Sequence, residues 1–170
     1  MERIADALKE AGAYLTAHPD EASYTDSVAR ATIEDGLRAR VVGTNGEELT
    51  TDMPASVGGA ATAPSPGWFL RAAEAACVAT LLAMRAAQLG LDPGRVTVEV
   101  DSQSDDRGIL GLDDGVAAGP LTTRVAVEFA TASADPADLR ALAEWAIDHC
   151  PVVDAVRRSI PMSVDVTVSP

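Results

Sequence analysis

Two cysteines are the residues best suited to chemistry in this chain, and their settings differ. Cys150 is followed by Pro151, which suits the first position of a helix, so its thiol is predicted at a helix N-terminus. The helix dipole there stabilises a thiolate, the nucleophilic form of cysteine. Cys77 lies inside a long apolar segment, where a thiol is usually a small buried hydrophobe. The residues alone leave two interpretations open: a thiol-redox pair, or two inert core cysteines.

A reactive Cys77 would need a cation nearby. Glu74 lies one helical turn before it and, when ionised, would raise the pKa of the thiol. The candidate cations are Arg38, Arg40, Arg71 and Arg85. His149 precedes Cys150 directly, although neighbours in a chain often point apart.

Other ligand-binding patterns are weak. The chain has two histidines and no Cys-x-x-Cys pair, which disfavours zinc. Asp101 and Asp105 lie in an acidic segment that lacks the ligand spacing and final Glu of a calcium loop. The Gly58-Gly59 pair has no phosphate-loop lysine and indicates a turn. We therefore predict neither a metal nor a cofactor.

The composition limits the class of protein. A length of 170 residues predicts a single domain over residues 1–170. The net charge of −13 argues against nucleic-acid binding, which needs a concentrated basic surface. The first ten residues lack the apolar core of a signal peptide, which predicts a cytoplasmic protein. Two cysteines there are more often free or catalytic than a structural disulfide.

The segment 63–91 must position Cys77, and it predicts a long central helix. Ser65 suits the N-cap, Pro66 the first helical position, and Gly90 the left-handed C-terminal residue. Many alanines let other backbones approach closely, so we expect a buried helix. A membrane-spanning role is disfavoured, because the uncharged run 75–84 is shorter than the roughly 20 residues that a bilayer requires.

The remaining elements follow from apolar periodicity and turn signals. Helices are predicted over 2–16, 135–148 and 152–159, and strands over 24–34, 37–41, 48–52, 96–100, 122–131 and 162–168. Residues 1–20 are expected to form a helical N-terminal extension. Because the strands do not alternate regularly with helices, an α+β fold is favoured over a doubly wound sheet.

Three motifs together resemble the OsmC/Ohr family, named for osmotically inducible protein C and organic hydroperoxide resistance protein. They are P-S-P-G-W followed by A-A-x-A-A-C-x-A-T, then D-x-x-S-D-D-R-G-x-L-G, then H-C-P-V. The resemblance covers roughly residues 24–168. It implies a two-layer fold with a long central helix and antiparallel sheets. It also implies an intertwined homodimer with a thiol site at each side of the interface.

The resemblance also implies an activity. Cys77 would attack an organic hydroperoxide, become a sulfenic acid and form a disulfide with Cys150, which an external dithiol such as dihydrolipoamide would reduce. The alternative is a non-catalytic dimer that binds a small apolar ligand, with both cysteines only packed. A weaker third possibility is a thiol hydrolase or transferase that uses Cys77.

This chain departs from the family pattern in its activating residues. The family's Glu, ten residues before the nucleophile, is replaced by Gly67. The family's arginine cannot be assigned among Arg30, Arg38 and Arg40. The side chains of Trp68, Phe69 and Met84 could line a substrate pocket, although a place in the dimer core is favoured. The peroxidase hypothesis requires the two sulfurs within reach and an arginine near Cys77.

Overall fold

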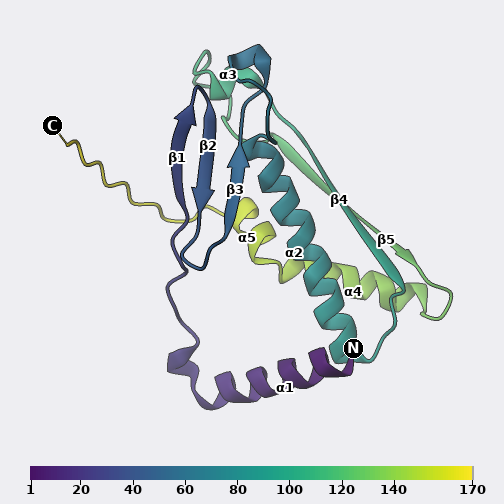
Figure 1. Ribbon diagram of the computed structural model, residues 1–170. Helices are drawn as coiled ribbons and strands as arrows, with labels where there is room; N and C mark the ends of the chain where they lie inside the picture. Colours follow the sequence, from purple (N-terminus) through teal and green to yellow (C-terminus); the bar gives the residue numbers. More distant parts are fainter. Residues whose placement is uncertain (170) are drawn as a thin grey trace.

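The computed structural model describes residues 1–169 and combines helices with antiparallel strands, so the α+β prediction is confirmed (Figure 1). The helices are α1 (Glu2–Ala17), α2 (Pro66–Leu89), α3 (Asp106–Ile109), α4 (Pro136–Asp148) and α5 (Pro151–Arg157). The strands are β1 (Arg30–Asp35), β2 (Arg38–Val42), β3 (Glu48–Thr51), β4 (Arg95–Gln103) and β5 (Thr122–Ala130).

Helix α2 has the ends that the sequence predicts. The Ser65 hydroxyl accepts a hydrogen bond from the backbone N–H of Trp68, which caps the first turn. Gly90 closes the helix at a φ of +65°, a left-handed conformation that favours glycine. Local chemistry at both ends therefore fixes the 24-residue length of the helix.

The apolar core lies around α2. This helix packs against β4, α4 and α5, and side chains of β4 and β5 pack against the same cluster. Val78, Leu82 and Ala86 lie four residues apart on one stripe and are fully buried. They join Leu142, Ala146, Cys150 and Val153 in one cluster. Because this stripe faces α4 and α5, it fixes the helix that carries Cys77 against the chain that carries Cys150.

The N-terminal sheet, in the order β1-β2-β3, has an apolar and a polar face. Directly paired residues share a face of an antiparallel sheet. One face therefore carries Ala31, Ile33, Ala39, Val41 and Leu49. The opposite face carries the Arg40–Glu48 ion pair. Ile33 on the apolar face is 64% exposed, and no helix of the described chain makes extensive contact with this sheet.

Two strand predictions need correction. The first strand begins at Arg30 rather than Tyr24, because β2 ends at Val42 and offers no partner beyond it. The prediction of a strand over 162–168 is wrong for the single chain. These residues follow α5 as an extended segment without strand pairing, and Met162 is 88% exposed. Figure 1 shows this segment projecting away from the molecule toward the C-terminus.

Helix α2 is long and apolar enough to cross a membrane by length and composition. Core helices of water-soluble proteins share that property, so it is weak evidence. The buried residues of α2 are Glu74, Val78, Leu82, Ala86 and Ala87, while much of the remaining surface of the helix is open in the single chain. The prediction of a buried central helix is thus met on one face.

Candidate functional site

Cys150 occupies the N-cap of α5, as its sequence setting predicts. Pro151 takes the first helical position, and the Sγ atom of Cys150 accepts a hydrogen bond from the backbone N–H of Val153 at 3.5 Å. The residue is fully buried within the apolar cluster. The short helix therefore presents its first N–H groups to the sulfur atoms of the site.

Cys77 is brought to the same place from α2. It is partly exposed and packs against the cluster that contains Cys150. Burial raises the pKa of the Cys77 thiol, and the adjacent Cys150 thiol raises that pKa further. The backbone N–H of Val152 acts in the opposite direction and lowers the pKa. The fold thus places two reduced thiols together, but it favours the protonated form of Cys77.

The arginines that the sequence offered as activating cations have other contacts. Arg38 donates to the hydroxyl of Thr62 at 2.9 Å, and Arg71 donates to the hydroxyl of Ser102 at 3.3 Å. The guanidinium of Arg40 is paired with Glu48. That of Arg85 lies over the Trp145 ring, 4.7 Å from its centroid. Within residues 1–169, no cation is among the causes that shift the pKa of Cys77.

His149 does not join the thiol pair, although it precedes Cys150. Its ring stacks on Trp145 with centroids 4.2 Å apart. Its Nδ1 atom is hydrogen-bonded to the Trp145 carbonyl oxygen at 2.8 Å. These two contacts hold the imidazole ring at the C-terminal end of α4.

Glu74 is buried, although the sequence offered it only as a charged neighbour of Cys77. It extends the buried stripe of α2 by one turn and is only 3% exposed. Burial raises the pKa of its carboxyl group, and the charge of Arg157 opposes that rise. Both side chains line a cavity of about 410 Å³ together with Val153. The signal that could have identified this feature is a charged residue at the stripe spacing of Val78 and Leu82.

The loop that enters α2 is organised by a buried carboxylate that sequence reasoning missed. Asp52 accepts hydrogen bonds from the N–H of Met53 at 2.8 Å and from the N–H and hydroxyl of Thr62 at 2.9 and 2.8 Å. The bonds from Thr62 are the main reason why the pKa of this carboxyl lies below its usual value. No local pattern distinguishes Asp52 from an ordinary residue at a strand end.

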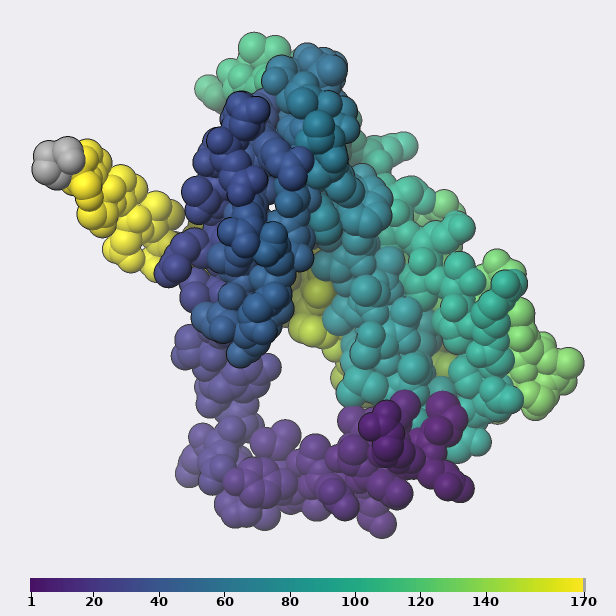
Figure 2. Space-filling model, viewed as in Figure 1, coloured from purple at the N-terminus to yellow at the C-terminus, as the bar shows by residue number. Residues whose placement is uncertain are grey.

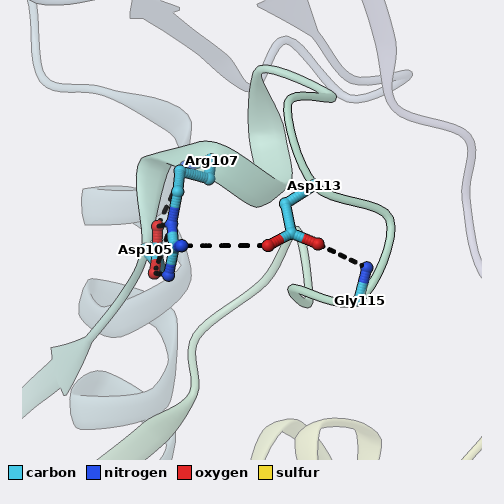
Figure 3. Close-up of polar contacts among 4 residues, drawn as sticks. All are labelled: Asp105, Arg107, Asp113 and Gly115. Carbon is cyan, nitrogen blue, oxygen red and sulfur yellow. Dashed lines mark hydrogen bonds and ion pairs between the residues drawn. The ribbon is translucent and has the colours of Figure 1, made fainter.

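The acidic segment after β4 is folded around an arginine (Figure 3). The guanidinium and backbone N–H of Arg107 donate to Asp105. Asp113 lies 3.8 Å from the same guanidinium and accepts a hydrogen bond from the N–H of Gly115. Asp101 is paired with Arg124 on β5. These carboxylates are held by basic groups of the chain.

No group of three or more His, Cys, Asp or Glu side chains among residues 1–169 is arranged to hold a metal ion. The aromatic candidates lie at the start of α2, where the Trp68 and Phe69 rings meet edge to face at 5.2 Å. Trp68 is exposed in the single chain, and Met84 is half-buried further along the helix.

Comparison with protein families gives one match, to the OsmC-like protein family over residues 58–165. The matched region contains both cysteines. No curated protein sequence matches the chain.

Solved structures with a similar fold include three bacterial proteins. An OsmC-like protein of Mycoplasma pneumoniae has a TM-score of 0.66 at 12% identity, covering 79% of this chain and 89% of its own. An organic hydroperoxide resistance protein OsmC of Legionella pneumophila has a TM-score of 0.59 at 20% identity, covering 79% and 91%. An organic hydroperoxide resistance protein of Elizabethkingia anophelis has a TM-score of 0.60 at 21% identity, covering 80% and 91%.

Proposed function

The chain belongs to the OsmC-like protein family, and on that basis we propose that it is a cysteine-based peroxidase that reduces organic hydroperoxides. The observation that carries the proposal is the meeting of Cys77 and Cys150 at the N-terminus of α5. Two similar structures bear the name organic hydroperoxide resistance protein, which agrees with this activity. At 20% and 21% identity they speak for the fold alone.

In the proposed reaction, the Cys77 thiolate attacks the distal oxygen of the hydroperoxide. A sulfur–oxygen bond forms as the oxygen–oxygen bond breaks, and the alkoxide leaves as an alcohol after taking a proton. The thiol of Cys150 then attacks the Cys77 sulfenic acid, giving a disulfide and water. An external dithiol, such as dihydrolipoamide, reduces the disulfide by two exchange steps and is itself oxidised.

The supply of thiolate is the demanding step. Burial and the Cys150 thiol hold the pKa of Cys77 above its usual value, and only the N–H of Val152 opposes them. Arg71 and Arg85, the candidate arginines on the same helix, have contacts elsewhere in the chain. We propose that a second copy supplies the cation, so that the site is complete only in the homodimer.

Surface area supports the homodimer. The chain exposes 12225 Å². A compact monomer of this mass exposes about 7,900 Å², so about 4,300 Å² more is open than a self-contained fold requires. Obligate dimers bury about 1,000–2,500 Å² on each partner, which this excess can provide.

The open surface is also apolar where a partner would be needed. The apolar face of β1-β2-β3 lacks a cover, and the C-terminal segment alternates exposed Met162, Val164, Val166 and Val168. Such alternation is typical of a strand, and a strand without a partner in its own chain can pair at a sheet edge of another chain. The proposal includes a single domain over residues 1–170, and a cytoplasmic location where thiols remain reduced.

The test is the consumption of cumene hydroperoxide by the purified protein with dihydrolipoamide, beside Cys77→Ser and Cys150→Ser variants. We expect turnover by the wild type and its loss in Cys77→Ser. The Cys150→Ser variant should complete a first turnover and then stop as a sulfenic acid, detectable by mass. Absence of turnover in the wild-type dimer would overturn the peroxidase proposal.

One observation favours a second function, a non-catalytic dimer that binds a small apolar ligand. Among the described residues, no cation contributes to the pKa shift of Cys77. An open cavity of about 560 Å³ beside β5 is lined by Val125, Val127, Phe129 and other side chains. The two functions differ in thiol reactivity. A packed Cys77 should react with iodoacetamide more slowly than a free thiol at pH 7, whether or not hydroperoxide is present, whereas a peroxidatic Cys77 should be protected by hydroperoxide.

A further inference from the structure

Helix α1 has one apolar stripe and a polar opposite face. Ile4, Leu8, Ala11 and Leu15 follow at spacings of four, three and four residues, which places them within a narrow sector of a helix. Glu2, Asp6, Lys9, Glu10 and Ala13 lie on the opposite side. A stripe of this kind normally faces other protein along its whole length.

Only the first half of this stripe is covered by the chain itself. Ile4, Ala5 and Leu8 are half-buried, and α1 packs against α2. Beyond them Ala11 is exposed and Leu15 is 44% exposed. No residue of α1 is fully buried. The stripe therefore continues, on the same face and without a break, from a covered half to an uncovered half.

The second half of α1 borders open space inside the outline of the molecule. Figure 2 shows a passage through the chain, bounded below by α1, on one side by the segment that leads to β1, and on the other by the region of α2 and β4. Figure 1 shows α1 crossing below this passage, from the C-terminal end of α2 toward the N-terminal sheet. Because α1 packs on α2 only in its first half, the apolar side chains of its second half are available to contact another molecule.

We propose that the second half of α1 docks on a second copy of this chain and acts as a clasp across the homodimer. This inference rests on the proposed homodimer and adds a contact to it. The excess exposed area calls for a partner of this size, and the twofold symmetry of a dimer provides two such clasps. Ala11 and Leu15 of each copy then lie against the other.

Charge argues for protein and against a membrane as the occupant. Helices that lie on a membrane surface carry Lys and Arg on their polar face. The polar face of α1 carries Glu2, Asp6 and Glu10 against Lys9, with Arg3 at its border. An anionic bilayer would repel this face. A second copy that contacts the apolar stripe would not be affected by it, because the acidic side chains lie on the opposite side of the helix.

The test is photo-crosslinking from α1 in the full-length protein. Leu15 is replaced by p-benzoylphenylalanine in a tagged copy, mixed with an untagged copy, and irradiated. Ala13, on the opposite face of the same helix, is the matched control. We expect a covalent product of two chains from position 15 in at least about tenfold higher yield than from position 13. Equal yields, or a product formed only with anionic vesicles, would overturn the clasp.

A second measurement separates this inference from the homodimer itself. Ala11→Lys and Ala13→Lys place the same charge on opposite faces of α1, and sedimentation gives the dimer dissociation constant. We expect about tenfold weaker association for Ala11→Lys, equivalent to about 1.4 kcal/mol, and no change for Ala13→Lys. Equal effects on an otherwise intact dimer would refute the clasp alone. A wild type that sediments as a monomer at every concentration would refute the homodimer and the clasp together.

Discussion

The helical half of the molecule and the N-terminal sheet are built from similar residues but reach different degrees of completion. Around α2, the side chains of Val78, Leu82 and Ala86 are fully removed from water by α4, α5 and the β4–β5 sheet. In the sheet, Ile33 and Leu49 lie on one apolar face and remain exposed. The helical half buries its apolar side chains within one chain, whereas the sheet leaves its apolar face exposed to solvent.

The two regions therefore differ in what stabilises them. The helical half is stabilised by contacts among its own elements, so its stability should not depend on protein concentration in the first instance. The sheet has backbone pairing but lacks a cover for its apolar face, so it buries little apolar area to offset the conformational entropy that folding costs. In the proposed homodimer, association supplies the free energy that the sheet lacks.

The largest effect should come from the closed core. Leu82→Ala removes a fully buried side chain and leaves a cavity among packed neighbours. We expect a loss of about 3–5 kcal/mol in the free energy of unfolding, measured by urea denaturation. The exposed Gln88→Ala on the same helix should change it by less than about 0.5 kcal/mol. Similar losses for both variants would mean that the core is not where the structure puts it.

The next largest effect should come from the open face of the sheet. Ile33→Gln replaces an exposed apolar side chain, which in a self-sufficient monomer would be almost neutral. In the proposed homodimer this side chain is buried, so we expect about 10–100-fold weaker association in sedimentation experiments. Thr32→Gln, on the opposite face, is the control. Unchanged association in Ile33→Gln would leave the sheet without an assigned partner.

The sequence predicts the helical half well because its signals are local. Ser65, Pro66 and Gly90 define α2, and the side chain of Asp135 caps α4 by accepting from the N–H of Ala137. The N-cap position of Cys150 follows from Pro151 alone. Such signals act within four residues of the chain and do not depend on the tertiary structure or on a partner.

The sequence fails where structure depends on distant residues. The alternation of Met162 to Val168 identifies a strand, but a strand exists only where an edge lies beside it, and the single chain offers none there. The buried carboxylate of Asp52 depends on Thr62, ten residues away. The proximity of Cys77 and Cys150 was implied by family resemblance, because no local pattern connects two residues so far apart.

Asp52 connects the two regions, and its removal should weaken the connection. Asp52→Asn replaces an acceptor of three hydrogen bonds with a group that carries an N–H₂ donor, so at least one N–H or hydroxyl loses its partner. We expect a loss of about 1–2 kcal/mol at pH 7. Because the folded-state pKa is lowered, the carboxylate stabilises the fold above about pH 4. That contribution disappears as the pH falls through the folded-state pKa.

The urea midpoint of wild type and Asp52→Asn, measured from pH 7 to pH 2, checks this prediction. The two curves should converge at the acid end. Asp35→Asn, which changes an exposed carboxyl of the hairpin, should follow the wild type throughout. A constant difference between wild type and Asp52→Asn at all pH values would show that the ionised form of Asp52 contributes nothing.

The smallest effect should come from Glu74, the carboxyl group buried in the helical half. Burial raises the pKa of Glu74, so the folded state binds this proton more tightly than the unfolded chain does. Its contribution is then fully present below the unfolded pKa of about 4.3 and is lost as the pH rises through the folded-state pKa. Glu74→Gln keeps the shape without the charge. We therefore expect it to raise the melting temperature by about 2–4 °C at pH 7 and by almost nothing at pH 4.

A variant of Arg157 measures how much charge, rather than burial, influences Glu74. The positive charge of Arg157 opposes the rise in the pKa of this carboxyl. Removing that charge in Arg157→Gln should destabilise the protein at pH 7 more than at pH 4, and the double variant with Glu74→Gln should remove this pH dependence. If Glu74→Gln instead lowers the melting temperature at pH 7, the ionised carboxylate has a stabilising partner. In that case the charge of Arg157 outweighs the cost of burial, and the closed core is stabilised by an ion pair as well as by apolar contacts, which the open sheet face lacks.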